Sequence, residues 1–237
     1  LRKGVKKMRK LIKSSLSLAL AALMSVSMLS HAGDAVAEDH SSAVSYNVGY
    51  MSEYWYRGVY QSESSVSFGA DMELGAMYLG TWFADVDEGV EYDFYAGFNF
   101  ELMGLPMYLG ATGYYYSDNF DGDYEELNTG VDLGFATIDY AFAGEFTAQA
   151  KDGGGKSDYE HFTITAPVPM TSLDFTYGTF QDELTGHYYE LSYGATVSGV
   201  DVGVVLGRNS DDSTTSSDKA GKENDTTYAT FSLGYSF

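Results

Sequence analysis

The chain has 237 residues and a formal net charge of −21, from 34 acidic and 13 basic side chains. An acidic chain repels phosphate, so nucleic acid is excluded as a partner. Aromatic residues make up 16% of the sequence, which argues against a disordered acidic chain, and with no Cys the chain has neither disulfides nor thiolate metal sites.

The first 37 residues are predicted to be a secretory signal and not part of the fold. Arg9, Lys10 and Lys13 precede an apolar run at residues 16–29, and small residues follow it. The run is too short and too rich in Ser for a membrane-spanning helix. We expect a signal peptide over residues 1–32, with Ala37 as a second cleavage position, and one mature domain over residues 33–237. Removing residues 1–37 leaves six basic and 33 acidic side chains, a net charge of −27.

Apolar and polar side chains alternate from residue 43 onward. This period of two predicts strands over residues 43–56, 65–74, 77–85, 90–102 and 107–117. The first strand places Tyr54 and Tyr56 on the same apolar face as Val44. The strands at 77–85 and 107–117 are apolar on both faces, so their orientation stays open.

The same alternation continues through the second half of the chain. Further strands begin near Leu127, Ile138, Phe162, Leu173, Tyr189 and Val200, and the last begins near Asp225. This gives about twelve strands of roughly 9–12 residues, the length that a tilted strand needs to cross a bilayer.

The last strand ends on an aromatic residue, with apolar residues two, four and six positions before it. The four are Phe231, Leu233, Tyr235 and Phe237. Any antiparallel edge strand could share this pattern, but an unpaired terminal edge promotes aggregation. The ending resembles the terminal signature of bacterial outer-membrane barrels. That resemblance implies recognition by the outer-membrane insertion machinery and closure against the first strand.

Connection lengths alternate along the chain. We count the predicted strands along the chain, starting with the one at residues 43–56. The connections after the second, fourth and later even-numbered strands are tight. Those after the odd-numbered strands are longer and polar, as at residues 118–124, 151–158 and 209–224. Short turns on one side and long loops on the other are typical of outer-membrane barrels, and a soluble sandwich has no reason to sort them. Aromatic residues at both strand ends fit the two bilayer interfaces. The predicted fold is all-β: a single transmembrane antiparallel up-and-down barrel in outer-membrane lipid, with both termini periplasmic.

If the polar face lines the lumen, its charged residues gather near both mouths. Glu53, Glu91, Asp93 and Glu190 fall toward the long loops, and Asp71, Glu73, Glu101, Asp132, Asp139, Asp174 and Asp201 toward the short turns; Glu145 and Arg57 complete the lumen set. Small residues between them, such as Gly97, Gly130 and Gly178, would leave room for water. Carboxylate rings attract cations, so the sequence predicts passive diffusion of small hydrophilic solutes with a preference for cations. Solvated strand ends, glycines that serve curvature and a loop-plugged lumen stay open as alternatives.

An enzymatic function has weaker support. His187 lies near Asp182 and Glu183, and a rim site of this kind would suit an outer-membrane protease or lipid-modifying enzyme. A lone rim His is usually solvated. The acidic loop at residues 118–123 is too short for an EF-hand. We therefore predict no enzyme, no cofactor and no metal site, with the rim enzyme and a closed structural or adhesive barrel as alternatives.

Residues 52–62, with the sequence SEYWYRGVYQS, resemble the S-D-Y-x-x-R-G-x-x-Q-S signature of the TorF porin family. The resemblance continues at residues 80–82, 85–87 and 91–97 and covers about the first quarter of the mature chain. Glu53 replaces the usual Asp, and Phe83-Ala84 departs from the family pattern. The resemblance implies a porin-like outer-membrane barrel without an established substrate. Arg57 of this motif is expected either to bond a carboxylate at the mouth or to buttress the first long loop.

Overall fold

The computed structural model describes residues 43–118, 120–147, 156–182, 184–210 and 225–237. The predicted signal peptide lies outside these residues. Most residues of the predicted loops at 151–158 and 209–224 lie outside them as well. No helix in the described part of the chain is long and apolar enough to cross a membrane.

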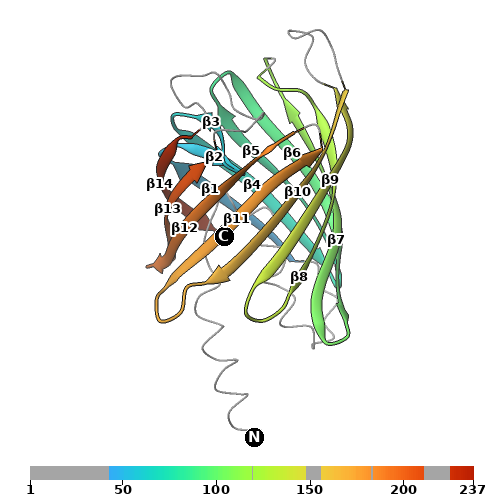
Figure 1. Cartoon of the computed structure of the whole chain (residues 1–237). Helices are drawn as coiled ribbons and strands as arrows, with labels where there is room; N and C mark the ends of the chain where they lie inside the picture. Colours follow the sequence, from blue (N-terminus) through green and yellow to red (C-terminus); the bar gives the residue numbers. More distant parts are fainter. Residues whose placement is uncertain (1–42, 119, 148–155, 183, 211–224) are drawn as a thin grey trace, which may run out of the picture.

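Twelve antiparallel strands close into a single barrel, as predicted (Figure 1). Neighbours in the chain are neighbours in the wall, apart from a short hairpin, β2–β3, that is left out of it. The strands of the wall are β1 (Ala43–Met51), β4 (Ser65–Leu74), β5 (Met77–Val86), β6 (Gly89–Leu102), β7 (Leu105–Tyr116), β8 (Tyr124–Asp132), β9 (Thr137–Thr147), β10 (Lys156–Pro167), β11 (Leu173–Asp182), β12 (Gly186–Val197), β13 (Val200–Asn209) and β14 (Thr227–Ser236). The hairpin consists of β2 (Tyr54–Tyr56) and β3 (Val59–Ser62).

The last strand closes the barrel against the first. The register of β1 and β14 pairs Asn47 with Ser236 and Met51 with Ser232. Beyond it, Tyr46 and Phe237 exchange two backbone hydrogen bonds of 2.9 Å each. The terminal Phe237 is therefore paired in the barrel seam, so this strand leaves no free edge.

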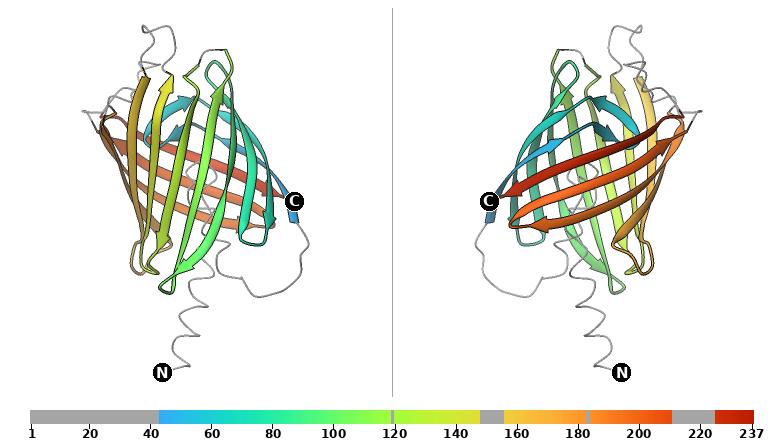
Figure 2. Two further views of the ribbon diagram at one scale, coloured as in Figure 1. Left: turned by 90° about the vertical axis from the view of Figure 1, so that its right-hand side faces the viewer. Right: turned by 90° about the vertical axis from the view of Figure 1, so that its left-hand side faces the viewer.

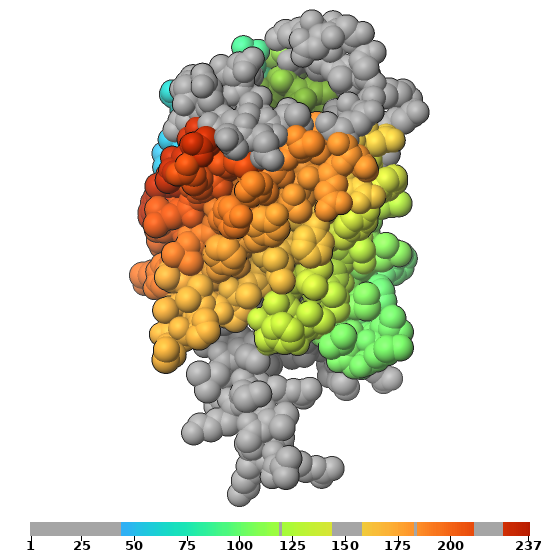
Figure 3. Space-filling view, viewed as in Figure 1, coloured from blue at the N-terminus to red at the C-terminus, as the bar shows by residue number. Residues whose placement is uncertain are grey.

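The outer face of the barrel is apolar. Large exposed side chains follow the outward row of each strand, including Phe68, Phe94, Leu109, Leu127, Phe175, Tyr193, Leu206 and Phe231. Figure 3 shows the wall as a continuous surface over the later strands. Water would disfavour so much exposed apolar area on a soluble protein, whereas lipid favours it. The barrel is therefore of the outer-membrane type.

The first strand is shorter than predicted. It ends at Met51, and Tyr54 and Tyr56 belong to the hairpin instead of the lipid-facing row. The alternation misleads here because β2 is also a strand, but one that pairs with β3 inside the barrel. The sequence pattern also predicts Tyr114, Tyr116 and Tyr188 among the aromatic residues at the bilayer interface near the long loops, but these three side chains face inward and are buried.

The lengths of the connections follow the predicted alternation only in part. The turns between β4 and β5 and between β12 and β13 are tight, as expected. Two connections on the opposite side are also short, because only Asp87 and Glu88 join β5 to β6 and only three residues join β11 to β12. The structure also orients the two strands left open, since Trp82 of β5 and Tyr108 of β7 face inward and are buried.

Candidate functional site in the barrel lumen

The β2–β3 hairpin folds into the lumen near the long-loop end. Both views in Figure 2 place it, in blue to cyan, within the outline of the barrel. Its two-residue turn has Arg57 at φ 51° and Gly58 at φ 74°. Positive φ at both positions is the type I′ geometry that suits a tight hairpin. The first long connection is thus a folded plug element and not an external loop.

The tip of the hairpin is bound to the far wall by an ion pair. Arg57 forms two bonds with Glu126 of β8, one from Nη1 to Oε1 and one from Nη2 to Oε2 at 3.1 Å. Their side chains are only 10% and 0% exposed. Burial by itself lowers the pKa of the Arg57 guanidinium, but the nearby Glu126 carboxylate raises it, and the pKa ends above its ordinary value. Arg57 therefore stays charged, and its partner is a buried carboxylate.

Glu126 is fixed by further donors from three strands. It accepts hydrogen bonds from Asn128 at 2.9 Å, from Tyr114 at 3.2 Å and from the Tyr159 hydroxyl. The hydroxyls of Tyr56 and Tyr114 also bond to each other at 2.7 Å. We did not predict Glu126, although it shares the inward parity of Asn128 and could have been found by extending that strand toward its N-terminus. A bidentate, multiply bonded carboxylate holds its partner in one geometry.

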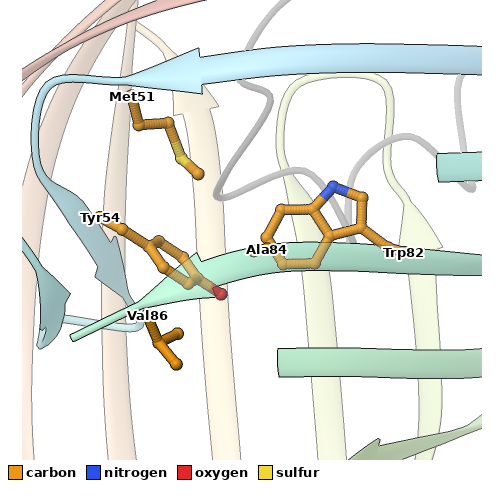
Figure 4. Close-up of a cluster of buried hydrophobic side chains, with 5 residues drawn as sticks. All are labelled: Met51, Tyr54, Trp82, Ala84 and Val86. Atoms are coloured by element: carbon orange, nitrogen blue, oxygen red, sulfur yellow. The ribbon is translucent and has the colours of Figure 1, made fainter. Parts of the chain in front are cut away.

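The hairpin also packs on the wall beneath its base. Tyr54 donates a hydrogen bond of 2.9 Å to Glu91 of β6, which accepts a second from Tyr116 at 3.0 Å. The ring of Tyr54 meets Trp82 edge to face, with centroids 5.8 Å apart. Figure 4 shows this cluster, which also contains Met51, Ala84 and Val86.

On its other side the hairpin contacts the last strands. Trp55 stacks on Tyr228 of β14 with centroids 4.1 Å apart and planes 7° from parallel. Tyr228 in turn donates a 2.7 Å hydrogen bond to Glu190. The carbonyl of Gly58 accepts a 3.2 Å hydrogen bond from Asn209. The hairpin therefore spans the lumen, with contacts on β6 and β8 on one side and β13 and β14 on the other.

One carboxylate under the hairpin has no partner. Asp93 of β6 is 0% exposed, and neither of its oxygens accepts a hydrogen bond. Its register neighbours are Trp82 on β5 and Tyr114 on β7, neither of which donates to it. A buried acceptor without a donor costs about 1–3 kcal/mol, and more when charged.

Tyrosines fill the middle of the lumen, where we expected open space beside small residues. A Cβ placed on Gly97 or on Gly110 would lie 2.2 Å from the Tyr78 hydroxyl. Tyr108 covers Gly130 in the same way and donates a 3.0 Å hydrogen bond to Asp139. These glycines therefore accommodate tyrosine rings from the adjacent strands instead of leaving room for water.

The predicted lumen acids divide into two groups. Glu91, Asp93 and Glu190 are buried near the hairpin, and Asp139 is buried beside Tyr108. Those near the short turns are half-buried or exposed: Asp71, Glu73, Glu101, Asp132, Asp174 and Asp201. Glu53 lies at the base of the hairpin and accepts a 2.9 Å hydrogen bond from Trp55. The side chain of Glu145 lies outside the described residues. The short-turn half of the lumen is thus an acidic vestibule below a tyrosine-filled layer.

Two of the histidines lie in the described part of the chain, and Glu183, which we placed beside His187, lies outside it. The ring of His187 packs beside Tyr177 and Tyr189 on the outward parity of β11 and β12. His161 is buried in the lumen, with its ring parallel to that of Tyr188. Within the described ranges, no group of three or more His, Asp or Glu side chains is placed to hold a metal ion.

Solved structures similar to this chain include a porin and a structure from a study of membrane proteins. A KdgM porin in complex with disordered oligogalacturonate aligns with a TM-score of 0.50 and 10% identity, over 83% of this chain and 99% of that one. A structure from a study of in-meso crystallization of membrane proteins aligns with a TM-score of 0.51 and 8% identity, over 82% and 83% of the two chains. At such low identity these likenesses establish the fold alone. No curated protein matches the chain in sequence.

The model of one protein family matches residues 35–237, which include all of the described barrel. That family is described as a bacterial protein family of unknown function. The match does not confirm the TorF resemblance of residues 52–62. The chain therefore belongs to the bacterial family of unknown function designated Gcw_chp, and it has the fold of an outer-membrane porin.

Proposed function

We propose that this protein is a passive channel of the outer membrane for small hydrophilic solutes, with a preference for cations. The observation that carries the proposal is the acidic vestibule, defined by Asp71, Glu73, Glu101, Asp132, Asp174 and Asp201. Among the side chains that the structure describes, Arg57 is the one Lys or Arg inside the barrel, and Glu126 neutralises it. A vestibule with fixed negative charge concentrates cations and repels anions.

The TorF resemblance of residues 52–62 supports the same proposal, since it implies a porin-like protein. The layer of tyrosine rings over Gly97, Gly110 and Gly130 would limit what passes to small solutes. The oligogalacturonate of the similar KdgM structure is not a candidate here, because a polyanion would meet repulsion in an acidic vestibule.

Reversal potentials in planar bilayers under a tenfold KCl gradient test the proposal. The protein should show a cation-selective potential, and neutralising the six vestibule acids to Asn or Gln should move it toward zero. A control variant with Asp85, Asp87 and Glu88 neutralised, outside the vestibule, should keep most of the selectivity. An anion-selective potential would refute the cation preference. A barrel that inserts correctly but carries no current, even after removal of the hairpin, would favour a closed structural or adhesive barrel.

A further inference from the structure

We infer that the β2–β3 hairpin is the gate of this channel, and that its undocking uncovers the carboxylates of Glu91, Asp93 and Glu126 as the cation-attracting constriction of the open state. This inference rests on the proposed channel function. The docked position of the hairpin seen here is then the closed state. When the hairpin leaves, a permeating cation meets Glu91, Asp93 and Glu126 first.

The hairpin is connected so that it can move without opening the wall. Its strands form a ladder only with each other, with Tyr56 opposite Val59, and one backbone hydrogen bond joins the Asp87 N–H of the β5–β6 turn to the Gln61 carbonyl. The ladder between β1 and β4 runs without interruption to Met51 opposite Ser65, directly below the point where the hairpin departs. Undocking therefore breaks none of the ladder bonds that close the barrel, and the twelve strands stay paired.

The hairpin is held down by both polar and aromatic contacts. The polar contacts are the Arg57–Glu126 pair, the Tyr54–Glu91 hydrogen bond, the Asn209 bond to the Gly58 carbonyl and the Asp87 N–H bond to the Gln61 carbonyl. Water can replace each of these bonds when the hairpin lifts, which would not be true of a large apolar core. The aromatic contacts are the edge-to-face packing of Tyr54 on Trp82 and the stacking of Trp55 on Tyr228, and undocking must break both.

Asp93 shifts the equilibrium between the docked and the undocked hairpin toward the undocked state. In the docked state both of its oxygens are buried without a donor, whereas Glu91 and Glu126 on either side of it are fully bonded. Lifting the hairpin exposes Asp93 to water and satisfies it. The same motion frees Glu126 from Arg57, so three carboxylates on β6 and β8 become available to a cation together.

Single-channel recording on full-length charge variants and on a hairpin deletion tests the gate. Arg57→Glu and Glu126→Arg should each raise the open probability at least tenfold, because like charges face each other. The double variant Arg57→Glu/Glu126→Arg keeps the net charge and should restore the low value. Replacing residues 53–63 by Asn-Gly joins two adjacent strand ends and should give a permanently open pore. Asp225→Asn, which breaks the exposed Arg208–Asp225 pair, should leave gating unchanged.

The outcomes separate the gate from the channel. If the deletion variant conducts but the charge reversals leave the open probability unchanged, the gate is refuted and the channel stands. If the deletion variant inserts and carries no current, the channel itself fails. Asp93→Asn should lower the open probability of the full chain and the cation preference of the deletion variant; no change in either would refute the role of Asp93. Heat-modifiable mobility on gels establishes that each variant is folded.

Discussion

The substitution Glu126→Gln should loosen the hairpin by removing the charge that holds Arg57. Both members of this pair are buried, with side-chain exposures of 10% and 0%, so Arg57 would be left as a buried charge without its counterion. Breaking a buried pair by removing one partner costs about 3–5 kcal/mol, and Gln keeps one acceptor, so the lower end applies. About 3 kcal/mol corresponds to a shift of roughly 100-fold or more in the ratio of undocked to docked hairpin.

Trypsin measures this ratio directly, because it cleaves after Arg57 only when the hairpin is undocked. When opening and closing are fast relative to cleavage, the cleavage rate follows the open population. Cleavage at Arg57 in the folded protein in detergent should therefore accelerate by about two orders of magnitude in Glu126→Gln. Asp225→Asn is the matched control, since it breaks a pair that is 57% and 56% exposed and worth at most about 1 kcal/mol. Equal cleavage at Arg57 in the wild type and Glu126→Gln would refute this account of the latch.

Three further substitutions test the wall of the barrel. Gly110→Ala places a Cβ 2.2 Å from the Tyr78 hydroxyl and should destabilise the barrel by about 1–3 kcal/mol, measured by urea unfolding in detergent. Phe237→Ser removes the ring that stacks on Tyr46 at 5.8 Å and should lower the amount of folded barrel in the outer membrane, read from heat-modifiable mobility; normal assembly would contradict the proposed terminal signal. Leu127→Arg, on the outward row, should cost about 2–4 kcal/mol in bilayers if it lies near the midplane, and an unchanged stability would argue against lipid contact there.

The barrel could be predicted from the sequence because its cause is local and repeated. Apolar and polar side chains alternate with a period of two in most wall strands, and a ring of such strands has one apolar and one polar face. The terminal pattern ending at Phe237 also indicated the seam. The signal peptide remains a prediction, as does the role of the lumen acids in selectivity.

The plug could not be predicted because its strand pattern continues that of β1. Residues 54–56 keep the parity of the lipid-facing row, although the chain leaves the wall after Met51. The positive φ values of Arg57 and Gly58 belong to the turn at the tip of the hairpin. The resemblance at residues 52–62 indicated that this segment is a family motif, but it did not predict that the segment lies in the lumen. The tyrosines above Gly97 and Gly130 were missed for a related reason, since they come from β5 and β7, whose two apolar faces hid their orientation.

Every proposal made above depends on one orientation, in which the apolar face of the barrel meets lipid and the polar face lines the lumen. Because the chain has no Cys, single nitroxide labels can be attached at Tyr193→Cys, on the outward row of β12, and at Ser192→Cys, on the inward row. In bilayers, the label at residue 193 should be relaxed by apolar oxygen and protected from a water-soluble nickel reagent, with the reverse at residue 192. Similar accessibility at both positions, or the opposite order, would contradict a barrel whose apolar face meets lipid.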